Sequence, residues 1–172
     1  QRGAPEAGWG RQHQLDMYDS PGHARDFEPR GYASTGTAEM IGNLIRFYRW
    51  TGDSKYLSRI PDAFEFLESI KYEQKEIDFF GLSIPEGQIL CPTFVEVGTN
   101  KPLYLHRADG KYWVNYDPRD IITHYKSYRF IKIAELKKLY EEVLAMSKED
   151  AVKESPFLGE NTNTYKFPRY AS

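Results

Sequence analysis

The chain has 172 residues, which is enough for one domain with a substantial hydrophobic core. Its 23 basic and 25 acidic side chains give a formal net charge of −2, which argues against a nucleic-acid-binding protein. No stretch approaches the roughly 20 apolar residues of a membrane span, and the single cysteine, Cys91, excludes an internal disulfide and a cysteine-based metal site.

The first patterned stretch is residues 8–15. Trp9 lies there between two glycines, and four polar side chains follow it, Gln12 among them. An indole has a flat apolar face, and the polar groups beside it can bond to the hydroxyls of a sugar ring. The stretch is therefore a candidate ligand-binding segment.

Arg25 follows a Pro-Gly turn and lies close to two carboxylates. Its planar guanidinium could hold a ligand carboxylate through two parallel hydrogen bonds, which a lysine cannot do. An intramolecular ion pair with Asp26 or Glu28 is an equally good interpretation. The sequence leaves both open.

Two helices are predicted over residues 37–70. Apolar residues recur at helical spacing behind Thr37, a candidate N-cap, and again in the second half of the range. Between the halves, Gly52 suits a left-handed C-cap, and Asp53 suits a cap of the segment that follows. Pro61 predicts a kink, or a helix that restarts with the proline in its first turn. We expect an antiparallel helical hairpin.

Residues 94–115 are predicted to form strands connected by turns. Two short runs of β-forming residues flank a turn of sequence GTNKP, and a second turn of sequence ADG precedes a third run. His106 and Arg107 should then lie at the tip of an aromatic-rich hairpin, as a cationic pair suited to an anionic, ring-shaped ligand. An ordinary surface hairpin, with Arg107 paired to Asp109, has the same spacing.

The other segments carry weaker signals. Residues 71–91 are charged and then irregular, because glycines and a proline interrupt any helix. An Asp-Pro pair predicts a short helix over residues 117–125, and apolar spacing predicts another over 134–146. Residues 147–172 form a polar tail. We find no domain boundary, so residues 1–172 are expected to be one domain.

Most catalytic motifs are missing from this sequence. It has no GxSxG segment and no glycine-rich phosphate loop, and its four histidines lack the spacing of zinc ligands. The arginines and the aromatic side chains remain as the candidate functional groups.

Three segments resemble the family 10 polysaccharide lyases, which are pectate lyases. In residues 9–28, the indole, a glutamine, the Pro-Gly turn and Arg25 recur with similar spacing. The predicted helical hairpin over residues 38–68 is similar to a helix pair of that family. The sequence EVGTNKP at residues 96–102, with Arg107 five residues after the proline, is similar to the family's ELGTNRP segment and its following arginine.

The resemblance implies a mainly α fold, half of an α/α toroid built from helical hairpins, with a short β-hairpin insertion that carries the site. The chain would be the C-terminal half of the family's catalytic domain. Its implied partner is then the missing N-terminal half, which a second chain could supply. A secreted or periplasmic location is also implied.

The implied activity is cleavage of polygalacturonate by β-elimination, with calcium bridging the substrate carboxylate and the protein. Arg107 corresponds to the residue that removes the proton at C5, and Arg25 to an arginine that binds the uronate carboxylate. The substrate subsites would include Trp9, Gln12, Asn100 and Lys101. An arginine can act as a base only if burial and nearby cations strongly disfavour its protonated form. The sequence names no set of calcium ligands.

Two other functions are compatible with the same residues. A non-catalytic uronate-binding protein would keep Arg25 and the aromatic side chains and would bind pectic oligosaccharides without cleaving them. A helical scaffold for protein partners would leave Arg107 in an ion pair and would bind no glycan.

Overall fold

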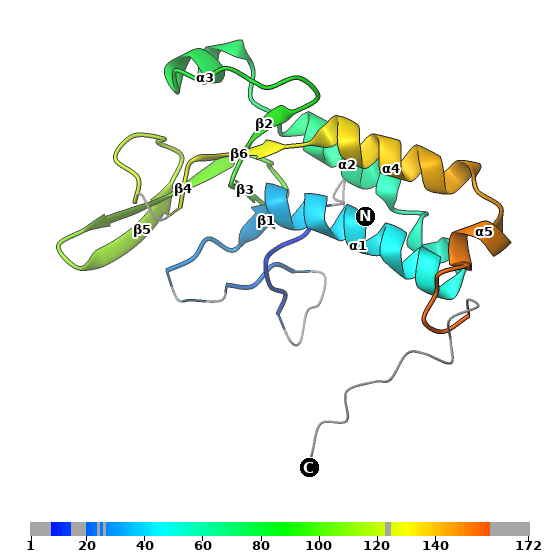
Figure 1. Cartoon of the computed structure of the whole chain (residues 1–172). Coiled ribbons are helices and arrows are strands. Elements are labelled where there is room, and N and C mark those ends of the chain that lie inside the picture. The colour runs from blue at the N-terminus through cyan, green and yellow to red at the C-terminus, as the bar shows by residue number, and fades with distance from the viewer. Residues whose placement is uncertain (1–7, 15–19, 24, 26, 123–124, 159–172) are drawn as a thin grey trace.

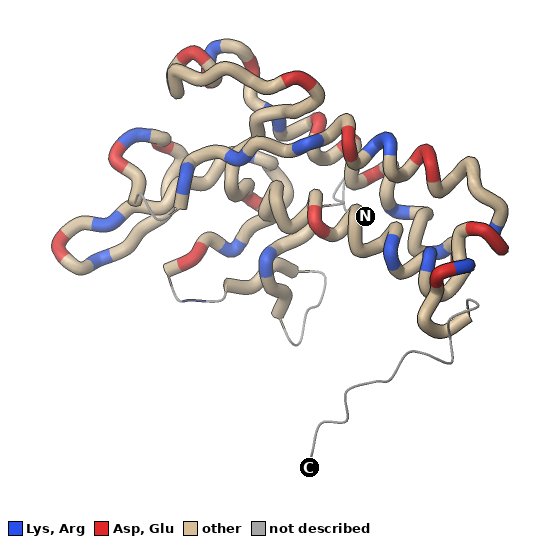
Figure 2. Tube along the Cα trace, in the orientation of Figure 1, with Lys and Arg blue, Asp and Glu red and all other residues tan. Residues whose placement is uncertain are grey.

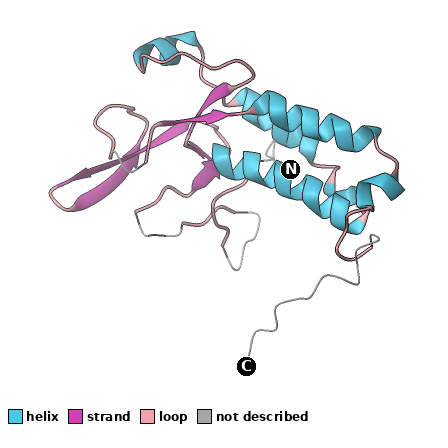
Figure 3. Ribbon diagram, in the orientation of Figure 1, coloured by secondary structure: helices cyan, strands magenta, loops and turns pink. Residues whose placement is uncertain are grey.

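The computed structural model describes residues 8–14, 20–23, 25, 27–122 and 125–158 (Figure 1). Helices hold 39% of the described residues and strands hold 20%. Most helices gather at one end of the molecule, while one short helix and most strands extend from the other (Figure 3). The fold is therefore mixed α/β, and the predicted mainly helical half-toroid is wrong.

Three helices pack side by side in the helical part. α1 (Ser34–Thr51) and α2 (Ile60–Ser69) form the predicted hairpin, with a short 3-10 turn, η1 (Ser54–Tyr56), between them. α4 (Ile133–Ala145) packs beside α1, and α5 (Lys148–Val152) contacts α1 as well (Figure 1). The apolar spacing of residues 134–146 thus correctly predicted a helix.

The link between α1 and α2 follows the predicted signals. Gly52 adopts a left-handed conformation with φ 67°, and its N–H donates to the carbonyl of Tyr48 at 2.7 Å. The carboxylate of Asp53 accepts the backbone N–H of Lys55 at 3.0 Å. Pro61 lies in the first turn of α2, where its missing N–H breaks no helical hydrogen bond. Both the C-cap and the restarted helix are confirmed.

Thr37 does not cap α1, which begins earlier, at Ser34. Its hydroxyl donates to the carbonyl of Ala33 at 3.1 Å and accepts the backbone N–H of Trp9 at 2.9 Å. The side chain is buried and ties the N-terminal segment to the helix. α1 starts directly after a strand, β1 (Gly31–Ala33), which the sequence analysis missed.

The strands form two antiparallel sheets. The larger sheet has the order β1-β3-β4-β5 and combines β1 with β3 (Phe94–Glu96), β4 (Pro102–Ala108) and β5 (Lys111–Asn115). The smaller sheet pairs β2 (Ile89–Pro92) with β6 (Tyr128–Ile131). The predicted strands of residues 94–115 are confirmed as β3, β4 and β5. β1 adds a fourth strand at the edge of their sheet.

Two further expectations differ from the structure. Residues 71–91 include α3 (Gln74–Phe79), whose first turn is held by reciprocal bonds between Glu73 and Glu76, in addition to β2. The predicted helix over residues 117–125 is wrong for its described part, residues 117–122. There Asp117 accepts the N–H of Arg119 at 3.0 Å and closes a turn instead of starting a helix.

The main hydrophobic core lies between the helices and the sheets. Phe66 of α2 is fully buried, and its ring meets Tyr32 of β1 edge-on, with ring centres 5.5 Å apart. Val95 of β3 and Ile131 of β6 belong to the same core. In a toroid, neighbouring helical hairpins would cover the α1–α2 helical hairpin. Here strands cover part of it, which is why the toroid prediction fails.

The predicted polar tail, residues 147–172, begins as packed structure. α5 is followed by Ser155, whose hydroxyl donates to the carbonyl of Trp50 in α1 at 2.6 Å. The ring of Phe157 lies 6.2 Å from that of Trp50. The rest of the tail, residues 159–172, lies outside the described residues. No described helix has the length and apolar character needed to cross a membrane.

Candidate functional site

The β4–β5 hairpin places His106 and Arg107 differently from the prediction. Its tip is the Asp109-Gly110 turn, where both residues have positive φ, 49° and 73°, as the tight hairpin turn of an Asp-Gly pair requires. His106 and Arg107 lie before the tip, inside β4, opposite Trp113 and Tyr112 respectively. Successive strand residues point to opposite faces, so the two side chains do not form a cationic pair.

One face of the hairpin carries a stack of two arginines and two aromatic rings. The guanidinium carbon of Arg107 lies 5.2 Å from the ring centre of Tyr112. Tyr112 stacks on Phe27, with ring centres 4.5 Å apart and planes inclined by 17°. The guanidinium carbon of Arg25 lies 5.9 Å from the ring centre of Phe27. We call Arg107, Tyr112, Phe27 and Arg25 the arginine–aromatic column.

Arg25 is fixed by a tyrosine and a carboxylate. Its Nη1 donates to the hydroxyl of Tyr125 at 3.0 Å and lies 3.7 Å from Oε1 of Glu28. The same hydroxyl donates to Glu28. Desolvation and the Glu28 carboxylate raise the pKa of Tyr125, so the hydroxyl keeps its proton and remains a donor. The predicted ion pair with Glu28 is present, yet the Arg25 side chain stays 56% exposed. Asp26 lies outside the described residues.

Arg107 forms no ion pair with any described residue, so the expected alternative pair with Asp109 is not formed. Its side chain is exposed beside the tip of the hairpin, and Figure 2 shows basic residues on both strands there. An arginine that removes a proton needs burial and neighbouring cations. Arg107 is exposed, and His106 faces the other side of the sheet. Its position suits anion binding better than proton removal.

Asn100 and Lys101 lie at the opposite end of β4, about 20 Å along the strand from Arg107. They line a groove of about 480 Å³, together with Tyr72, Tyr104 and Tyr116. The Lys101 ammonium lies 5.5 Å from the ring centre of Tyr116. Oδ1 of Asn100 is shielded from solvent and has no hydrogen-bond partner among the described residues.

The turn of sequence GTNKP is braced by Glu96. Its carboxylate accepts the hydroxyls of Thr99 and Tyr116, the latter at 2.8 Å, and these bonds hold the pKa of Glu96 below its usual value. Asn100 has a left-handed φ of 56°, and its N–H donates to the Glu96 carbonyl at 3.0 Å. This part of the sequence motif therefore has a direct structural role in forming the turn.

Trp9 and Gln12 lie at a third place, before β1 and α1. Trp9 is partly buried against the main core, and its carbonyl accepts the N–H of Ala33 at 2.9 Å. Gln12 is exposed, and its carbonyl accepts the N–H of Gly22 at 2.8 Å. The structure thus brings the two predicted arginines together but does not gather the predicted subsite residues around them.

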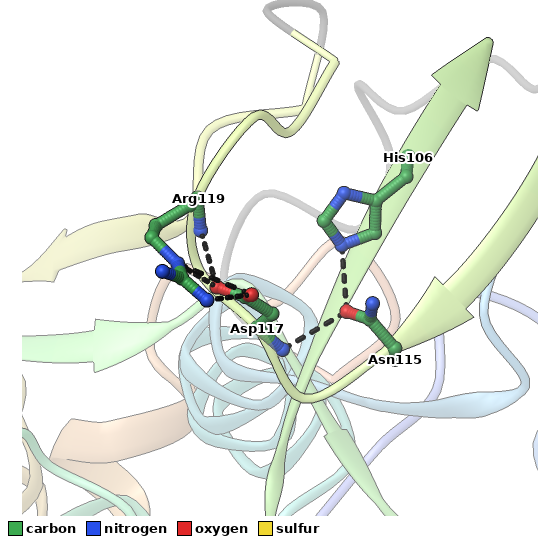
Figure 4. A network of polar contacts seen from close by, with 4 residues as sticks. All are labelled: His106, Asn115, Asp117 and Arg119. Atoms are coloured by element: carbon green, nitrogen blue, oxygen red, sulfur yellow. Dashed lines mark hydrogen bonds and ion pairs between the residues drawn. The ribbon is translucent and has the colours of Figure 1, made fainter.

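The other face of the hairpin holds a polar network that the sequence analysis did not find (Figure 4). Nε2 of His106 lies 2.6 Å from Oδ1 of Asn115, and that oxygen also accepts the backbone N–H of Asp117 at 2.9 Å. Because this atom accepts the Asp117 N–H, it is the amide oxygen of Asn115 and not the nitrogen. Nε2 of His106 must therefore carry a proton and donate to it. Arg119 holds the Asp117 carboxylate, with its Nη2 at 2.6 Å. Only the strand register brings these residues together.

We expect Asp117 to titrate far below an ordinary aspartate. Hydrogen bonds from the Arg119 side chain and backbone lower its pKa to about 2, and His106 contributes. Because the folded-state pKa is depressed, this stabilisation is complete above the ordinary aspartate pKa and is lost as the pH falls through about 2. Carboxyl-detected NMR titration should show this value. Arg119→Ala should move it towards 3.8, and an unchanged value would contradict the assigned cause.

The calcium expectation finds no support among the described residues. No group of three or more histidine, cysteine, aspartate or glutamate side chains lies close enough there to hold a metal ion. Calcium requires six to eight oxygen ligands. The described residues offer no such cluster of carboxylates, and no chemical step is assigned to calcium.

No family model, curated protein or solved structure matches this chain. The resemblance to the family 10 polysaccharide lyases therefore stays a prediction.

Proposed function

We propose that this chain binds acidic saccharides of the uronate class through the arginine–aromatic column. One observation carries the proposal: two arginines from distant parts of the sequence lie at the two ends of a single aromatic stack. The sequence predicts both arginines as binding residues, Arg25 beside a Pro-Gly turn and Arg107 in a hairpin.

The chemistry of the column suits a polyuronate. A guanidinium holds a carboxylate through two parallel, charge-assisted hydrogen bonds. The rings of Tyr112 and Phe27 restrict the arginines, so little conformational freedom is lost on binding. Since a polyuronate repeats a carboxylate on every sugar unit, one chain can meet both cations at once. The 39% exposed ring of Tyr112 lies between them.

Cleavage by β-elimination is a further proposal for the same site, with Arg107 as the residue that acts at C5. It rests on the resemblance alone, as do a calcium requirement, a secreted or periplasmic location and a missing N-terminal half. The exposure of Arg107 favours the binding function, which needs none of these. The absorbance of unsaturated products, followed with and without added calcium, tests cleavage separately.

Removal of the Arg107 charge should weaken binding of trigalacturonate about tenfold. A hydrogen bond to a charged group contributes about 1.5–3 kcal/mol, and part of that is lost to solvent at an exposed site. Arg107→Gln keeps a polar side chain, and the double variant with Arg25→Gln should show a larger loss. Isothermal titration calorimetry measures both, and higher salt should weaken the wild-type binding.

Arg59→Gln is the matched control, because it removes the same charge at an exposed side chain just before α2. We expect its affinity to equal that of the wild type. If Arg59→Gln and Arg107→Gln weaken binding equally, the effect reflects net charge and the column is not the site. Absence of any binding to trigalacturonate would refute the proposal outright.

A further inference from the structure

The face of the hairpin opposite the column carries an exposed indole. Trp113 lies across from His106, with ring centres 5.5 Å apart and planes inclined by only 12°. His106 is 5% exposed and Trp113 is 45% exposed. Because the histidine covers one side of the indole, the exposed area must belong to the other side and the edges.

The histidine that supports the indole is itself held in place. It donates from Nε2 to Asn115, whose oxygen is in turn fixed by the backbone N–H of Asp117 (Figure 4). A flat aromatic surface with its orientation already set loses little entropy when a ligand stacks on it. By holding His106, the network fixes the orientation of the Trp113 indole in addition to closing the end of the hairpin.

The groove beside the GTNKP turn lies further along the same face of β4. Tyr104 lies two residues before His106 on the same side of β4, about 7 Å away along the strand, and it lines the groove. Tyr116, also in the groove, is 53% exposed, and Glu96 fixes its hydroxyl. An extended ligand on the indole would thus reach the groove.

One lysine lies beside the exposed indole and another lies in the groove. Lys111 lies two residues before Trp113 on the same face, near the tip, and Lys101 lies in the groove. Within the described part of the chain, neither forms an ion pair. Two other lysines of the groove are neutralised: Lys71 pairs with Glu68 at 2.9 Å and Lys75 with Glu76 at 3.4 Å. The shielded Oδ1 of Asn100 also accepts no hydrogen bond from the part of the chain that the structure describes.

From these features we infer a second saccharide-binding site on this face, which we call the indole face. A sugar ring stacks its C–H side on Trp113, an acidic group of the next sugar unit meets Lys111, and a longer acidic chain reaches Lys101 in the groove. A protein partner would require an apolar centre around the indole. Lysines, tyrosine hydroxyls and an amide oxygen surround it instead, and these match the hydroxyls and carboxylates of an acidic saccharide.

The indole face uses other residues than the column and does not rest on the proposed function. Titration of the full chain with trigalacturonate should show a binding event that changes the tryptophan fluorescence, and the column adds a second event where the proposed function also holds. Trp113→Ala should remove one binding event, or weaken it about tenfold, and abolish the fluorescence change. Neutral galactotriose should bind the indole face weakly and the column not at all.

Val114→Ala is the matched control, because Val114 is the adjacent residue of β5, is similarly exposed and faces the column side. It should keep both binding events. Retained binding at the column shows that Trp113→Ala is folded. If Trp113→Ala leaves stoichiometry, affinity and fluorescence unchanged, the indole face is not a site. If instead the Arg25→Gln/Arg107→Gln double variant loses nothing while Trp113→Ala loses all binding, the proposed function fails and this inference stands.

Discussion

Phe66→Ala should lower the free energy of unfolding by about 3–5 kcal/mol. Phe66 is fully buried in α2, and its edge-on contact with Tyr32 joins the helical hairpin to β1. Truncation removes the buried ring and leaves a cavity between helix and sheet, which rigid strands cannot readily fill. Because a typical domain has only about 5–15 kcal/mol of stability, the variant should be close to unfolding at room temperature.

Urea unfolding followed by circular dichroism measures this loss. The matched control is Phe79→Ala in α3, because the Phe79 side chain is 58% exposed and the same truncation there creates no buried cavity. Its free energy of unfolding should change by no more than about 0.5 kcal/mol. Equal losses in the two variants would mean that Phe66 is not the contact that joins the helices to the sheet.

Gly31→Ala should lower the free energy of unfolding by about 1–3 kcal/mol, less than Phe66→Ala. A Cβ at this position would lie 2.3 Å from the carbonyl oxygen of Val95, which is backbone and cannot rotate away. β1 would have to move off β3. Since β1 runs directly into α1, its displacement also disturbs the connection between the sheet that carries the hairpin and the helices.

The same substitution in α1 serves as its control. Gly42→Ala places a methyl group where nothing lies within 4 Å, so helix propensity decides the outcome. Alanine is favoured over glycine inside a helix by about 0.5–1 kcal/mol, and Gly42→Ala should therefore stabilise the chain. Thermal unfolding of both variants would show opposite shifts. A Gly31→Ala protein as stable as the wild type would contradict the close packing of β1 on β3.

Local signals correctly predicted the parts of this fold that local interactions determine. Gly52 ends α1 and Pro61 begins α2 because backbone conformation at each is set by the residue itself. The Asp109-Gly110 turn closes the hairpin for the same reason. The short strand β1 has no such signal, because a three-residue strand is stable only through its partner β3, which lies far along the chain. The toroid prediction failed because it extended one correctly predicted helical hairpin to the whole chain.

The candidate site also has a part that the sequence predicted and a part that only the tertiary structure decided. Spacing made Arg25 and Arg107 candidates, each with an ion pair as the alternative, and placed a hairpin around Arg107, while the resemblance supplied their binding and catalytic roles. They could not show that Phe27 and Tyr112 stack between the two arginines, or that His106 faces away from Arg107 onto Trp113. Those relations depend on strand register and on packing between segments distant in the sequence. A shift of one residue in the register would exchange the two faces of the hairpin. By itself, the sequence determined which side chains are candidates for binding an anionic ligand. Only the tertiary structure decided which of them share a face of the hairpin.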